Sequence, residues 1–209
     1  MSKYELFMRL NTGGSKLSDQ EVRSCLLISV NSDMFETVKR MSEYIPFKES
    51  VGVPQRAFEE QFDIELVLRF IILRNLPEVG IKNTKDLDSF LTNQMIKIAR
   101  DPGFDWNQEI RAFESTFDLI RNSSSGGAFK KYDAQRDKFS GVFLVSVYEV
   151  IALGLGYQYG KDKLDSIDIV DIAKNLWSNE EFTRWSGSGV NASTRLPRLI
   201  PLGRKLLSP

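Results

Sequence analysis

The stretch Gly141–Gly160, GVFLVSVYEVIALGLGYQYG, is the part of the sequence that resembles a membrane span, and its interpretation decides the fold. It has about the length that a helix needs to cross a bilayer. However, Glu149 lies at its centre, glycines interrupt it, and no basic residue within it could anchor it at the lipid headgroups. These features favour a helix buried in the core of a globular protein, so the sequence predicts no membrane partner.

Apolar residues spaced three and four apart predict helices on both sides of this stretch. Ser18 and Glu21 form an S-x-x-E capping box that opens a helix running to about Val30. Residues 45–53 are expected to form a loop, and no segment carries a convincing hairpin signal. The other predicted helices cover residues 3–10, 32–41, 55–75, 85–100, 106–121, 142–155, 164–176, 180–185 and 195–207. The predicted fold is all-α or nearly so, an irregular bundle of about eight to ten helices with little strand.

The length of 209 residues fits one large domain or two small ones. Asn122–Gly127, NSSSGG, is of low complexity and is the best candidate for a boundary. It would separate a helical lobe at 1–121 from a second helical lobe at 122–209. One continuous domain remains the alternative.

The charge is balanced, with 28 basic and 28 acidic residues, so the chain as a whole is not an electrostatic binder of nucleic acid. The last 28 residues, Phe182–Pro209, depart from this balance because they contain no acidic residue. The candidates for nucleic-acid contact are the five basic residues of this stretch: Arg184, Arg195, Arg198, Arg204 and Lys205. Trp177 and Trp185 nearby could stack on bases. A solvated basic tail is the other interpretation.

The composition excludes several kinds of chemistry. The chain contains no histidine and a single cysteine, which removes histidine-based catalysis, a four-cysteine zinc site and an internal disulfide. Asp165, Asp168 and Asp171 are spaced three apart and could ligate a metal, but a solvated helix face explains them better. Cys25 lies in an apolar run and is predicted to be buried and inert. We predict no catalytic residues, metal or cofactor, and a lone cysteine without an export signal favours the cytoplasm.

The segment Leu6–Arg23, LFMRLNTGGSKLSDQEVR, carries the strongest motif. Its two glycines precede a helix, where they could hold a phosphate or simply form a turn. The segment resembles one found in a large bacterial family of unknown function that has a ParB/sulfiredoxin-like N-terminal domain and includes the GmrS-like half of GmrSD-type restriction systems. Glu65–Phe70, ELVLRF, and the basic stretch Arg195–Lys205 are similar to further parts of that family.

The resemblance implies a nucleotide-hydrolysing N-terminal domain with a D-G-Q-Q-R motif, which this sequence does not contain. It also implies that the segment around the two glycines faces the nucleotide or joins two domains. The residues for which it predicts such a contact are Asn11, Thr12, Gly13, Gly14 and Arg23. Apolar side chains at Tyr4, Leu6 and Phe7 would then lie where the nucleotide-binding domain docks.

The sequence thus predicts a non-catalytic helical interaction or support module of a restriction or phage-defence protein. Its partner would be another protein or a nucleotide-binding N-terminal domain, with possible DNA contact through the C-terminal basic stretch. One alternative is a nucleotide-dependent nuclease component of a split defence enzyme. Another is a stand-alone regulator that binds a full-length relative.

Overall fold

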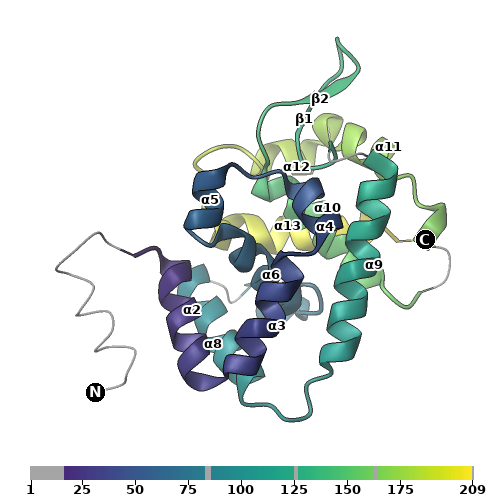
Figure 1. Ribbon diagram of the computed structural model, residues 1–209. Helices are drawn as coiled ribbons and strands as arrows, with labels where there is room; N and C mark the ends of the chain where they lie inside the picture. The colour runs from purple at the N-terminus through teal and green to yellow at the C-terminus, as the bar shows by residue number, and fades with distance from the viewer. Residues whose placement is uncertain (1–16, 83–85, 125–126, 162–163, 209) are drawn as a thin grey trace.

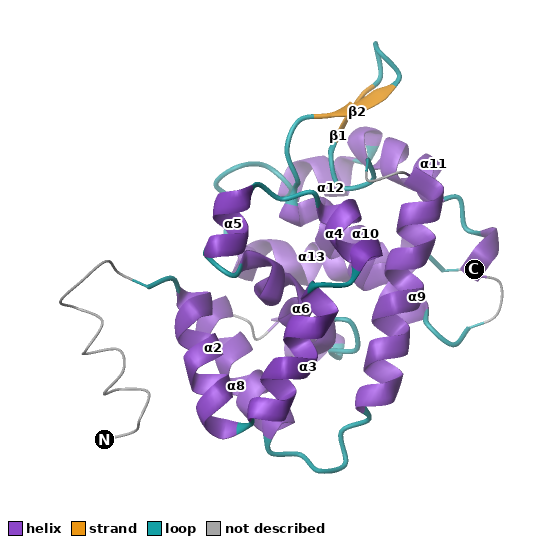
Figure 2. Cartoon of the chain, in the orientation of Figure 1, coloured by secondary structure: helices purple, strands orange, loops and turns teal. Residues whose placement is uncertain are grey.

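The computed structural model describes residues 17–82, 86–124, 127–161 and 164–208. These residues form twelve α-helices, two short 3-10 helices and one two-stranded hairpin, which confirms the predicted fold class (Figures 1 and 2). The predicted helix 3–10 and the segment Asn11–Gly14 lie outside them. The elements are α2 (Asp19–Val30), α3 (Ser32–Ser42), α4 (Ile45–Val51), α5 (Gln55–Glu59), α6 (Phe62–Leu73), α7 (Glu78–Lys82), α8 (Leu87–Ala99), α9 (Trp106–Ser124), β1 (Lys131–Asp133), β2 (Lys138–Ser140), α10 (Val145–Gln158), η1 (Leu164–Ser166), α11 (Ile169–Asn175), η2 (Leu176–Ser178), α12 (Glu180–Trp185) and α13 (Ala192–Leu206).

Helices α6 and α10 form the centre of the protein because they are apolar on nearly every side. Helix α10 packs against α13, α9 and α6, and Figure 1 shows it surrounded by these helices. The apolar stretch Gly141–Gly160 therefore contains a core helix, as predicted. Within the described chain, no helix is both long and apolar enough to cross a membrane.

Helices α10 and α13 meet backbone to backbone at a pair of glycines. A Cβ atom added to Gly154 would lie 2.7 Å from the carbonyl oxygen of Gly203. A Cβ atom added to Gly203 would lie 2.9 Å from the carbonyl carbon of Val150 and closer still to its oxygen. Only glycine allows the two helices to approach this closely.

A cluster of phenylalanines joins α4, α6 and α9. The Phe47 and Phe117 rings meet edge to face at 4.9 Å, and Phe70 meets Phe113 in the same way at 5.3 Å. Phe117 also stacks on Tyr148 of α10 at 6.3 Å. Because these residues belong to one core cluster, the predicted lobes 1–121 and 122–209 share a hydrophobic core.

Two predictions for the segment 45–75 were wrong. The expected loop 45–53 contains helix α4, since Pro46 is tolerated in a first turn and Gly52, at φ 48°, ends the helix in the left-handed conformation. The expected single helix 55–75 is broken at Gln61, which has φ 57° and separates α5 from α6.

The hairpin and the last helix also differ from the prediction. Strands β1 and β2 are joined by the four-residue loop 134–137. Two backbone N–H groups of this loop donate to the carboxylate of Asp133 at the end of β1, and Asp137 adopts φ 45°. This loop contains none of the Asn-Gly or Asp-Gly signals of a two-residue turn, so the hairpin was missed. Helix α13 starts at Ala192, which places Pro197 and Pro201 in its interior.

The predicted capping box is present. The Ser18 hydroxyl accepts a hydrogen bond from the Glu21 backbone, and the Glu21 carboxylate accepts one from the Ser18 backbone at 2.7 Å. We expect Ser18→Ala to lower the free energy of unfolding by about 1 kcal/mol, because one donor at the helix N-terminus loses its partner. Urea denaturation would measure this, and Ser29→Ala, on the exposed face of the same helix, should change the stability by less than about 0.5 kcal/mol.

Candidate functional site

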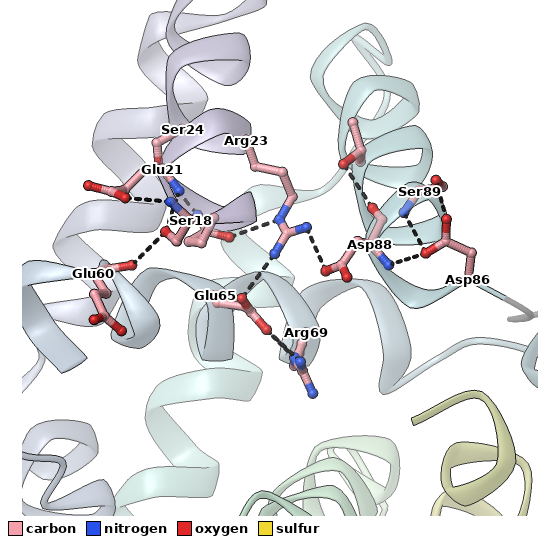
Figure 3. A network of polar contacts seen from close by, with 12 residues as sticks. Ser18, Glu21, Arg23, Ser24, Glu60, Glu65, Arg69, Asp86, Asp88 and Ser89 are labelled. Atoms are coloured by element: carbon pink, nitrogen blue, oxygen red, sulfur yellow. Dashed lines mark hydrogen bonds and ion pairs between the residues drawn. The ribbon is translucent and has the colours of Figure 1, made fainter. Parts of the chain in front are cut away.

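The structure places Arg23 inside the protein, where it joins three helices (Figure 3). Its side chain is 1% exposed. Its Nε donates to Gln20 at 3.0 Å, Nη2 to Glu65 of α6 at 2.9 Å, and Nη1 to Asp88 of α8 at 3.1 Å. Arg23 thus holds α2 against α6 and α8.

The contacts of Arg23 continue into a buried series of alternating charges. The second oxygen of Glu65 accepts from Arg69, whose Nη1 donates to Glu149 of α10 at 3.3 Å. Glu149 has no exposed side-chain surface, and its carboxylate accepts hydrogen bonds from Nε and Nη2 of Arg195 at 2.6 and 2.9 Å. We name this series the buried ion-pair chain. Its members in order are Asp88, Arg23, Glu65, Arg69, Glu149 and Arg195, and of these six the terminal Asp88 is exposed, with 53% of its side chain accessible.

The buried ion-pair chain has three guanidinium groups and three carboxylates, so its formal charge is zero. Burial acts to lower the pKa of Arg195, but the hydrogen bonds and the charge of Glu149 outweigh it and raise that pKa above its ordinary value. Ions removed from water are tolerated only when each is paired and hydrogen-bonded, as these are.

The three stretches for which the sequence predicted a family resemblance meet in the buried ion-pair chain. Arg23 ends the first stretch, Glu65 and Arg69 belong to ELVLRF, and Arg195 begins the last. Glu149 connects the last two stretches, and it was not among the predicted site residues. The available signal was a carboxylate in the middle of an apolar helix, which requires a buried cationic partner.

The five basic residues of the C-terminal stretch separate into two groups. Arg195 is engaged by Glu149, and Nη2 of Arg204 donates to backbone carbonyls at the end of α6 and just beyond it, at 2.7–3.3 Å. Arg184, Arg198 and Lys205 are exposed. None of these three lies within 4.0 Å of a carboxylate oxygen of a residue that the structure describes.

Arg184 and Arg198 lie over the same tryptophan. Asn179 caps α12 by accepting a hydrogen bond from the Phe182 backbone, and Trp185 is the last residue of that helix. The Arg184 guanidinium lies 5.2 Å from the Trp185 ring centroid, and the Arg198 guanidinium reaches the same ring from α13 at 5.6 Å. The arrangement presents two cations, neither with a carboxylate partner among the described residues, around one half-buried indole, which suits a phosphate backbone with stacked bases.

Other predicted residues have structural explanations. Asp168 caps α11, and Asp171 accepts a hydrogen bond from Asn175. Among the described residues, no group of three or more potential ligands is arranged to hold a metal. Cys25 is exposed on α2, so the prediction that it is buried was wrong, because the apolar run around it extends over more than one helix face.

Comparisons of the sequence with protein-family models, with curated proteins and with solved structures found no match in any of the three.

Proposed function

We propose that this chain is a non-catalytic helical interaction module that contacts DNA through Arg184, Trp185 and Arg198. The observation that carries the proposal is the pair of exposed guanidinium groups around one indole, both without a carboxylate partner in the described structure. Arginine binds phosphate oxygens through its planar fork of donors, and an aromatic ring accepts any base by stacking.

The context that we propose is a restriction or phage-defence protein in the cytoplasm, acting with a nucleotide-binding domain or another protein partner. The resemblance of Leu6–Arg23, Glu65–Phe70 and Arg195–Lys205 supports it.

Reversing both charges tests the DNA contact. We expect the double variant Arg184→Glu/Arg198→Glu to bind a fluorescein-labelled oligonucleotide at least about tenfold more weakly at low salt, because two phosphate contacts are lost. The slope of log affinity against log salt should fall by about two units for the same reason. Fluorescence anisotropy over a salt series measures both quantities.

The control is Arg40→Glu/Arg111→Glu, which makes the same change of net charge at two exposed arginines of α3 and α9. It should leave binding close to that of the unaltered protein. Equal losses in both double variants would mean that only overall charge matters, and the proposal would then be wrong. Trp185→Leu should weaken single-stranded more than duplex DNA, because only unpaired bases are free to stack.

A further inference from the structure

A cavity of about 540 Å³, broadly open to solvent, lies beside the ends of α6, α10 and α13. Its lining residues are Asn75, Leu76 and Pro77 after α6, the acidic Glu78 at the start of α7, Tyr157 of α10, and Pro201, Arg204 and Lys205 of α13. Its volume falls in the range of small-molecule binding sites. Arg204 is six residues beyond Arg198, about 9 Å further along the axis of α13.

Arg204 is held in place at this cavity by the protein itself. Its Nη2 donates to the carbonyls of Leu73, Arg74 and Leu76 at 3.3, 3.0 and 2.7 Å. Its guanidinium carbon lies 4.2 Å from the centroid of the Tyr157 ring. Its Nε is buried and has no hydrogen-bond partner among the described residues. The guanidinium is therefore held in position, and its Nη1, unlike the buried Nε, is the donor group left for a ligand because it has no hydrogen bond to a described residue.

Arg204 also differs from the other arginines that are withdrawn from solvent. In the described chain these are Arg23, Arg69, Arg74 and Arg195, and each has a carboxylate within 3.3 Å. Arg204 has no such partner in the same part of the chain. Burial lowers the pKa of Arg204, and the nearby Glu78 carboxylate offsets this only in part. Glu78 therefore acts on Arg204 from beyond ion-pair distance, and a partly desolvated cation with no carboxylate within 4.0 Å among the described residues is a natural place for an anion to bind.

Lys205 adds a second cation to the same cavity. It is exposed and has no ion pair with a described residue, while Leu76, Pro77 and Pro201 provide apolar wall. We propose that this cavity binds a phosphate-bearing small molecule of about mononucleotide size. Its phosphate group lies at Arg204 and Lys205, and its body lies against the apolar wall. The volume is many times the ~30 Å³ share of one water molecule, which leaves room for more than a phosphate group.

Thermal shift and isothermal titration with adenosine monophosphate, ribose 5-phosphate, inorganic phosphate and adenosine test the proposal. We expect the two phosphate esters to bind more tightly than inorganic phosphate, and adenosine, which lacks the anion, not to bind. Lys205→Glu should weaken the esters at least about tenfold, because a repulsive charge replaces an attractive one. Arg184→Glu/Arg198→Glu should bind them as the unaltered protein does.

Lys97→Glu is the matched control, since Lys97 is an exposed lysine in the last turn of α8, as Lys205 is in α13. Equal weakening by the two lysine variants would overturn the proposal, as would a failure of both esters to bind. A short DNA duplex that binds with sensitivity to Lys205→Glu while neither ester binds would assign the two cations to nucleic-acid phosphates instead.

Discussion

Glu149→Gln is expected to lower the free energy of unfolding by about 3–5 kcal/mol, because it leaves two buried guanidinium groups facing a neutral amide. Glu149 is fully buried and accepts hydrogen bonds from both Arg69 and Arg195. The variant keeps the shape of the side chain and removes only its charge. For a chain of this size the loss corresponds to a fall in Tm of roughly 6–20 °C.

Chemical denaturation followed by circular dichroism gives the free energy, and Glu36→Gln on the exposed face of α3 is the control. A double-mutant cycle with Arg195→Gln measures the interaction free energy between Glu149 and Arg195. The double variant should be less destabilised than the sum of the single variants, by about 1 kcal/mol or more. Additive losses, or a loss below about 1 kcal/mol for Glu149→Gln, would show that the pair contributes little.

Gly203→Ala is expected to cost about 3 kcal/mol or more, since the new methyl group would overlap the backbone of Val150. A clash with a main chain cannot be relieved by changing a rotamer, so α10 and α13 must move apart. The higher helix propensity of alanine returns only about 1 kcal/mol.

Gly187→Ala serves as the comparison, because a Cβ atom at that exposed loop position meets no other atom within 4 Å. Urea denaturation of the two variants should show a large loss for Gly203→Ala and almost none for Gly187→Ala. Near-equal free energies of unfolding for the two variants would mean that α10 and α13 can move apart with little loss of stability.

Helical periodicity was sufficient to predict the fold class and the central position of α10. The boundaries failed where one residue adopts a left-handed backbone, as Gln61 does between α5 and α6, because the apolar pattern continues through the break. The hairpin was missed for a related reason. Asp137 in its loop adopts a positive φ, and an aspartate is only a weak signal for that conformation.

The candidate site was predictable only in part. A basic C-terminal stretch with a tryptophan is visible in the sequence, and the pair Arg184 and Arg198 lies within it. The sequence could not separate these arginines from Arg195 and Arg204, because their partners are distant along the chain. Glu149 is 46 residues from Arg195, and the carbonyls that hold Arg204 are about 130 residues away.

The order of the buried ion-pair chain has a consequence for synthesis on the ribosome. Arg69 and Glu149 emerge long before Arg195, so the carboxylate cannot be fully neutralised until the last helix has left the exit tunnel. A fragment that ends at residue 121 would likewise bury Arg69 without Glu149. The two halves are therefore expected to fold as one cooperative unit and to resist separate expression, because the Arg69–Glu149 ion pair and the hydrophobic core both extend across the boundary between them.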